Sequence, residues 1–306
     1  MQTYWGVDLG GTKIEGVVLS APSPDAVIIR KRIDTESQFG YEHIVNQIHK
    51  LIEQLKAETG IQPAKIGFCT PGTLDPETGT MKNSNIVCIN GRPFRDDLAR
   101  TLGVPVTTTN DANCFALSEA TMGIVQDIIP DYRMIFGVIM GTGVGGGVIF
   151  RGNDGVPVVQ AGRQGVGGEW GHNILEENGY PCYCGNRGCN EQVISGPALQ
   201  RFYHEQSGES RNLKEILDRY HQGIDPYAST TVERLLENFG RAVSTIVNML
   251  DPDAIVLGGG VGNVDLLYTE GVERAKKYVF NNGRLSTLFL KPKLGDSAGV
   301  FGAALL

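Results

Sequence analysis

The chain has 306 residues, of which 41% are hydrophobic and 20% charged, so it is long enough and apolar enough to bury the cores of two lobes. This composition excludes a disordered chain, and the net charge of −7 argues against binding to a nucleic-acid backbone. No apolar stretch reaches the length of a membrane-spanning helix and the first residues do not resemble a signal peptide, so we expect a cytoplasmic protein that binds neither membranes nor nucleic acid.

The first third of the chain alternates short apolar runs with turns. Residues 44–55 carry apolar side chains at helical spacing and predict an amphipathic helix. Strands are expected at 4–8, 17–19, 27–29, 65–69 and 104–108. The resulting order β-β-β-α-β-α-β predicts a mixed sheet covered by helices.

The second half begins in a similar way, with strands at 134–140 and 146–150 on either side of a glycine turn. A long amphipathic helix over 232–250 ends where Pro252 blocks its continuation, and a buried strand follows at 255–257. The small, apolar segment 295–306 predicts a tightly packed terminal helix. We therefore predict an α/β protein with two lobes. The expected lobes are a small one of residues 1–115, completed by 296–306, and a large one of residues 116–295.

Glycine accounts for 41 residues, and three glycine-rich turns follow predicted strands, at 8–13, 141–147 and 258–262. Glycine lets backbone N–H groups approach an anion closely, and Asp8 could hold Mg²⁺ through water. The alternative for each turn is a simple hairpin. Residues 141–146 match G-x-G-x-x-G, but a strand rather than a helix follows, which excludes the dinucleotide-binding motif. Together the turns fit a nucleotide held between two lobes.

Three of the six cysteines lie within eight residues of one another. One imidazole and three thiolates suit a tetrahedral, structural Zn²⁺ site with no open position. The predicted ligands are His172, Cys182, Cys184 and Cys189. The alternative is a set of unrelated core thiols, which is what we expect of Cys69 and Cys114.

Acidic residues stand next to these features. Asp111 follows a strand end and could act as a general base for a hydroxyl nucleophile, although an N-terminal helix cap is an equally open interpretation. Glu169 and Glu191 flank the cysteines, so a zinc loop over 169–191 would hold both carboxylates rigidly for the hydroxyls of a sugar.

These motifs together resemble the ROK family of bacterial sugar kinases and repressors, in the actin–hexokinase–Hsp70 superfamily. The resemblance covers essentially the whole chain. It rests on DLGGTK at 8–13, NDAN at 110–113, GTGVGGG at 141–147, ExGH at 169–172, CxCGxxGCxE at 182–191 and GDSAGVFGAA at 295–304. It implies a two-lobed actin-like ATPase fold, similar to ribonuclease H, with nucleotide and sugar in the cleft between the lobes.

The resemblance also implies roles for individual residues. Asp111 would be the catalytic base, and His172 would serve both sugar and zinc with one ring nitrogen each. The implied sugar contacts are Asn110, Asp111, Glu169, His172, Glu191, Gly72 and Asn85. The implied Mg-ATP site comprises Asp8, Gly10, Gly11, Thr12, Lys13, Thr142, Gly143, Gly259 and Gly260. The cofactors would be ATP, Mg²⁺ and structural Zn²⁺, and family habit suggests a homodimer.

The expected reaction is transfer of the γ-phosphoryl group of ATP to the 6-hydroxyl of a hexose. Residues 82–85 and 90–94 resemble fructokinases and mannokinases, whereas 110–120 fits N-acetylglucosamine kinases equally well. A sugar-sensing repressor without its DNA-binding domain is a remote alternative. It is remote because the first predicted strand begins by residue 4 and leaves no room before it for an N-terminal helix-turn-helix. A sugar-independent ATPase would not need Glu169, His172 and Glu191, and a pseudokinase would not need Asp8 and Asp111.

Overall fold

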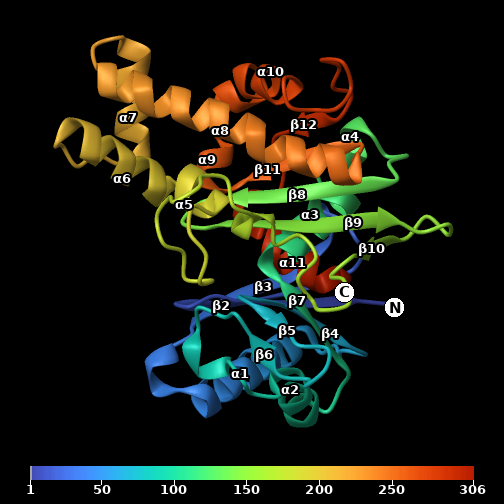
Figure 1. The fold of residues 1–306 in the computed structure, drawn as a ribbon. Helices are drawn as coiled ribbons and strands as arrows, with labels where there is room; N and C mark the ends of the chain where they lie inside the picture. The colour runs from blue at the N-terminus through green and yellow to red at the C-terminus, as the bar shows by residue number, and fades with distance from the viewer. Residues whose placement is uncertain (1) are drawn as a thin grey trace. The chain divides into compact units, whose positions relative to one another are not determined.

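The computed structural model describes residues 2–306 and divides into two compact units (Figure 1). Unit 1 contains the described residues up to Pro130, together with Gly147–Gly167 and Lys293–Leu306. Unit 2 contains Asp131–Gly146 and Gly168–Pro292. The predicted lobes, 1–115 with 296–306 and 116–295, remain a prediction.

Unit 1 is built on a five-stranded sheet with strand order β3-β2-β1-β4-β7. The first three strands are antiparallel, and β4 and β7 run parallel to β1. The bounds are β1 (Tyr4–Leu9), β2 (Lys13–Leu19), β3 (Val27–Asp34), β4 (Ile66–Thr70) and β7 (Val106–Asn110). All five predicted strands and the mixed sheet are therefore confirmed.

Helices cover both faces of this sheet. Trp5, Val7 and Leu9 of β1 pack with α1 (Tyr41–Thr59) and α2 (Phe94–Leu102) in one core. Successive side chains of a strand point to opposite faces, so Gly6 and Asp8 lie on the other face, against α11 (Ala298–Leu305). There α11 also packs on α3 (Asp111–Met122), which α4 (Ile124–Ile128) follows. The sequence thus places Asp8 on the α11 side of the sheet.

The second five-stranded sheet repeats this strand order, as β10-β9-β8-β11-β12. In unit 2, β8 (Met134–Met140), β11 (Ala254–Gly258) and β12 (Leu288–Leu290) are parallel. Strand β9 (Val144–Arg151) begins in unit 2 and continues in unit 1, where it pairs with β10 (Pro157–Val159). Because residues 147–150 continue as strand, the exclusion of a dinucleotide motif is confirmed.

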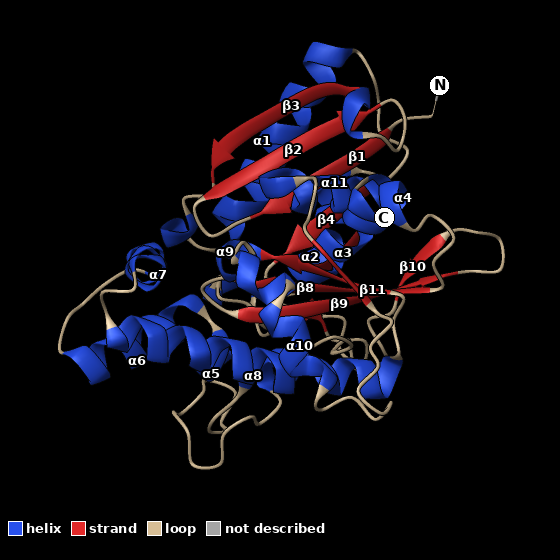
Figure 2. Cartoon of the chain, turned by 90° about the horizontal axis from the view of Figure 1, so that it is seen from above, coloured by secondary structure: helices blue, strands red, loops and turns tan. Residues whose placement is uncertain are grey.

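The helices of unit 2 are dominated by α8, which is 25 residues long (Figure 2). It ends before Asp251, which takes a left-handed conformation in front of Pro252, as the sequence predicts. The bounds are α5 (Asn190–Ile194), α6 (Gly196–Ser207), α7 (Leu213–Gln222), α8 (Pro226–Leu250), α9 (Gly259–Gly262) and α10 (Glu270–Lys276). Within residues 2–306, no helix combines the length and apolarity needed to cross a bilayer.

Several elements were not predicted. Helix α7 buries only Ile216, but its start is marked by a capping box of Asn212 and Glu215, and apolar side chains follow at helical spacing, at Leu213, Ile216, Leu217 and Tyr220. The two-stranded hairpin of β5 (Thr73–Leu74) and β6 (Met81–Lys82) is too short to give a pattern. The helix was therefore predictable from its spacing and its cap, whereas the hairpin was not.

Candidate functional site

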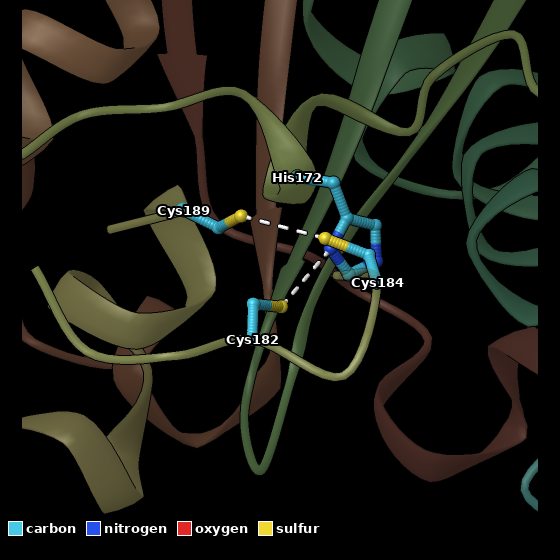
Figure 3. A group of neighbouring side chains, drawn as sticks. All are labelled: His172, Cys182, Cys184 and Cys189. Atoms are coloured by element: carbon cyan, nitrogen blue, oxygen red, sulfur yellow. Dashed lines mark hydrogen bonds between the residues drawn. The ribbon is translucent and has the colours of Figure 1, made fainter. Parts of the chain in front are cut away.

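The predicted zinc ligands converge in unit 2 (Figure 3). His172 Nδ1 lies 3.5 Å from Cys182 Sγ, and Cys184 Sγ lies 3.6 Å from Cys189 Sγ. The four donor atoms lie within 4.8 Å of one another. Zinc bonds of the usual length at tetrahedral angles place ligand atoms about 3.5–3.8 Å apart. The donor set and its spacing therefore fit one tetrahedral Zn²⁺.

The loop over residues 169–191, called here the cysteine loop, is shaped by turns around this cluster. Gly185 and Gly188 have positive φ values of 93° and 68°, conformations that side chains disfavour. Hydrogen bonds from Cys182 N to Asn186 O and from Gly185 N to Cys182 O close the knuckle. Burial raises the pKa of the Cys189 thiol, so its ionisation depends on a nearby positive charge such as a metal ion.

The two ring nitrogens of His172 point to different partners. Nδ1 faces the thiols, whereas Nε2 lies 3.0 Å from the hydroxyl of Tyr183, whose ring packs edge-on against the imidazole. The prediction gave one ring nitrogen to zinc and the other to a sugar, so Tyr183 is a neighbour of His172 that the sequence analysis missed. Tyr183 is 74% exposed, so its hydroxyl lies at an accessible surface.

Glu191 and Glu169 are half-buried in the same unit as the histidine. Glu191 lies in the first turn of α5, and its Oε2 accepts a hydrogen bond from the N–H of Val144 at 3.1 Å. Glu169 directly precedes the short 3-10 helix Trp170–His172. Both residues thus stand close in the chain to ligand residues of the cluster, and their role toward a sugar stays a prediction.

The turn Gly141–Gly143 and the first residues of α9 border a pocket of about 600 Å³ in unit 2. Thr142, Gly259 and Gly260 are exposed, and Gly259 has a φ of 79° and lies against the backbone of Met140. The pocket extends between the starts of α6 and α7, and its lining includes Gly196, Gln200, Leu213, Lys214 and Val264. Its volume lies in the range of small-molecule sites.

In unit 1, the β1–β2 turn brings together the predicted residues Asp8 and Gly10–Lys13. Gly10 N donates to Lys13 O at 2.9 Å, and the Thr35 hydroxyl donates to Gly10 O at 2.7 Å. The side chains of Thr12 and Lys13 remain exposed. Burial, aided by the charge of Asp111, raises the pKa of Asp8 above its usual value. Asp8 is thus a hard oxygen donor in a setting where a cation would stabilise its charge, which fits Mg²⁺.

Asn110 and Asp111 stand where β7 ends and α3 begins. Asn110 is the N-cap, since its side chain accepts from Asn113 N at 2.9 Å, and Asp111 is the first helical residue. The alternative that Asp111 caps the helix is therefore wrong. Asp111 Oδ1 accepts from Ala112 N at 2.8 Å. Although its side chain is accessible, the surrounding protein partly desolvates the carboxyl and raises its pKa, as suits a general base.

The last two predicted sugar contacts, Gly72 and Asn85, lie next to Ser84 in unit 1. Gly72 has a φ of 78°, and a β-carbon there would stand 2.7 Å from the Ser84 nitrogen. Asn85 is exposed next to that serine. Cys69 and Cys114 are 1% and 0% exposed, which confirms them as core residues.

The model of the ROK family matches residues 4–306. The chain is 35% identical to the N-acetyl-D-glucosamine kinase of Aliivibrio fischeri, with 99% of this chain and 98% of that protein covered. The protein of the same name from Pasteurella multocida is also 35% identical, with 99% and 98% covered.

Solved structures agree in fold. The ROK hexokinase from Thermus thermophilus superposes with a TM-score of 0.86 at 31% identity, covering 99% of this chain and 97% of that one. The ROK family glucokinase from Streptomyces griseus, solved with glucose and AMPPNP, gives 0.76 at 27% identity, with 99% and 98% covered. The predicted actin-like fold class is confirmed, and this chain belongs to the ROK family.

Proposed function

We propose that this chain is an ATP-dependent kinase that phosphorylates the 6-hydroxyl of N-acetyl-D-glucosamine. The observation that carries the proposal is the placement of His172 and Glu191 on one loop that also contacts the backbone after the Gly141–Gly143 turn. Groups suited to sugar hydroxyls and a turn suited to phosphates therefore belong to one compact unit. The 35% identity to N-acetyl-D-glucosamine kinases supports this sugar.

In the proposed reaction, Asp111 accepts the proton of the 6-hydroxyl as that oxygen bonds to the γ-phosphorus. The bond from this phosphorus to the bridging oxygen breaks, and ADP leaves. The raised pKa of Asp111 supports this role, because a base works best when its pKa lies closer to the working pH. The proposed sugar contacts are Asn110, Glu169, His172, Glu191, Gly72 and Asn85.

The nucleotide is proposed to use the three glycine turns. Exposed Thr142 and Gly260 border the pocket that would take the base and ribose. The other proposed contacts are Asp8, Gly10, Gly11, Thr12, Lys13, Gly143 and Gly259. Bound Mg²⁺ would neutralise phosphate charge, and Asp8 is the residue proposed to hold it through water.

Zinc is proposed to be structural. His172 and the three loop cysteines fill a tetrahedral ligand set, so the metal would stabilise the cysteine loop and offer no open position to a substrate. We also propose a homodimer on the basis of the family resemblance. Light scattering of the purified protein tests the mass of the assembly.

A coupled assay of ADP release over N-acetylglucosamine, glucose, mannose and fructose tests the substrate. We expect the highest kcat/KM with N-acetylglucosamine and a product phosphorylated at C6 by ³¹P–¹H correlation. A hexose kinase is the second candidate, favoured by the similarity to the Thermus thermophilus hexokinase. Preference for glucose, mannose or fructose would support that candidate, and ADP release that no sugar stimulates would refute both.

A further inference from the structure

Residues of the cysteine loop hold the backbone that follows the Gly141–Gly143 turn. Trp170 donates its indole N–H to Gly145 O at 2.9 Å, and Gly171 packs against the carbonyl of Val144 so closely that a β-carbon would overlap with it. Glu191 Oε2 accepts the N–H of the same Val144. The start of β9 is therefore fixed on several sides by the loop that carries the proposed sugar contacts.

Glu191 also touches the turn itself. A β-carbon at Gly143 would stand 2.7 Å from Glu191 Oε2, whereas one at Gly141 would meet no atom of the described chain within 4 Å. Within residues 2–306, Glu191 Oε2 has the N–H of Val144 as its hydrogen-bond partner and Oε1 has none. The carboxylate thus rests on the turn through one oxygen and leaves the other for a substrate hydroxyl.

We propose that Glu191 is a positioning residue that couples the phosphate-binding turn to the sugar site. The inference rests on the proposed function, because it requires phosphates at Gly141–Gly143 and a sugar hydroxyl at Glu191. A shift of the turn displaces the carboxylate, and a sugar that fixes the carboxylate also fixes the turn. Such linkage is reciprocal, so each substrate raises the affinity for the other by the same factor.

Two alanine substitutions in the turn test the effect on sugar. In Gly143→Ala the new methyl group meets the flexible end of Glu191, so the chain can fold while the carboxylate is displaced. We expect the Kd of N-acetylglucosamine, measured by calorimetry without nucleotide, to rise about tenfold, equivalent to about 1.4 kcal/mol. The matched variant Gly141→Ala should stay within about twofold of the wild type, since its methyl group enters open space.

Two substitutions of Glu191 test the effect on nucleotide. Glu191→Ala removes the acceptor of Val144 N–H and should weaken ADP binding without sugar about five- to tenfold. Glu191→Gln keeps an oxygen acceptor and should restore most of this affinity. A residue that contacts only sugar would leave ADP binding unchanged in both variants.

The outcomes separate this inference from the proposed function. A wild-type protein that binds ADP but none of the four sugars refutes the proposed function, while the ADP measurements still decide whether Glu191 positions the turn. Hydrogen exchange of the Val144 amide needs no ligand and should be faster in Glu191→Ala. Unchanged exchange there, unchanged ADP affinity, or equal sugar affinity of the two turn variants would each overturn the role assigned to Glu191.

Discussion

Replacing Glu119 by alanine should destabilise unit 1 strongly. The side chain is fully buried in α3, and its carboxylate accepts backbone N–H groups from Ile124 at 3.0 Å, from Lys293 at 3.0 and 3.1 Å, and from Leu294 at 2.8 Å. The last two begin the segment that returns to unit 1 and leads into α11. Each donor left without an acceptor costs about 1–3 kcal/mol. Because water can enter the vacated space, we expect a total loss of about 3–5 kcal/mol.

Urea unfolding followed by tryptophan fluorescence measures this loss. The chain has two tryptophans, so a Trp170→Phe background leaves Trp5, in the core of unit 1, as the only reporter. Asp127→Asn is the matched control, because it removes an exposed ion pair with the side chain of Lys293 and should leave the midpoint nearly unchanged. A loss below about 1 kcal/mol in Glu119→Ala, or equal effects of the two substitutions, would refute the anchoring role.

Three further predictions concern the site. Cys184→Ser should lose most of its bound zinc in a metal assay, because a hydroxyl replaces a thiolate, whereas Cys88→Ser outside the cluster should keep one zinc per chain. Asp111→Asn should lower kcat more than about 100-fold. Folding raises the pKa of Asp111, so the wild type loses stability as the pH rises above the unfolded pKa and this carboxyl ionises in the folded protein. Asp111→Asn should therefore have a higher melting temperature than the wild type at pH 7, and the difference should vanish below about pH 4. Tyr183→Phe removes the hydroxyl that lies 3.0 Å from His172 Nε2 and should lower the KM for the sugar without changing the zinc content. Tyr180→Phe, in the same loop, should change neither the KM nor the zinc content.

Local patterns predicted most of the fold. Strands β1, β2 and β4 and helix α8 were predictable because each buries an apolar run or stripe of its own. The cluster of His172 and three cysteines was predictable because its ligands lie within one short loop, so their spacing in the sequence already limits their distances in space. Helices α6 and α7 were missed although the sequence carries signals for both, namely a serine cap followed by a proline at the start of α6 and a capping box followed by an apolar stripe in α7.

The finer chemistry of the site depends on contacts that spacing does not encode. Asn110 and Asp111 are both good capping residues, and only the backbone conformation shows that Asn110 caps and leaves Asp111 on the first turn. Tyr183 lies between two metal-ligand candidates, and no pattern marks its contact with His172. The bond from Glu191 to Val144 joins segments 47 residues apart, which no local periodicity predicts.

The glycines of this chain fall into different groups, and two of these groups differ in whether a neighbouring part of the chain packs against the glycine. At Gly67 and Gly302 a β-carbon would overlap with backbone, so these glycines allow α11 to pack closely on β4 and α3. Gly11, Gly141 and Gly260, one from each glycine turn, face open space, where a β-carbon would meet no atom of the described chain within 4 Å. Packing therefore does not require glycine at these three positions, and none of them has a positive φ. Close approach by a ligand would account for glycine at these positions, which agrees with the proposal that phosphates bind at the three turns.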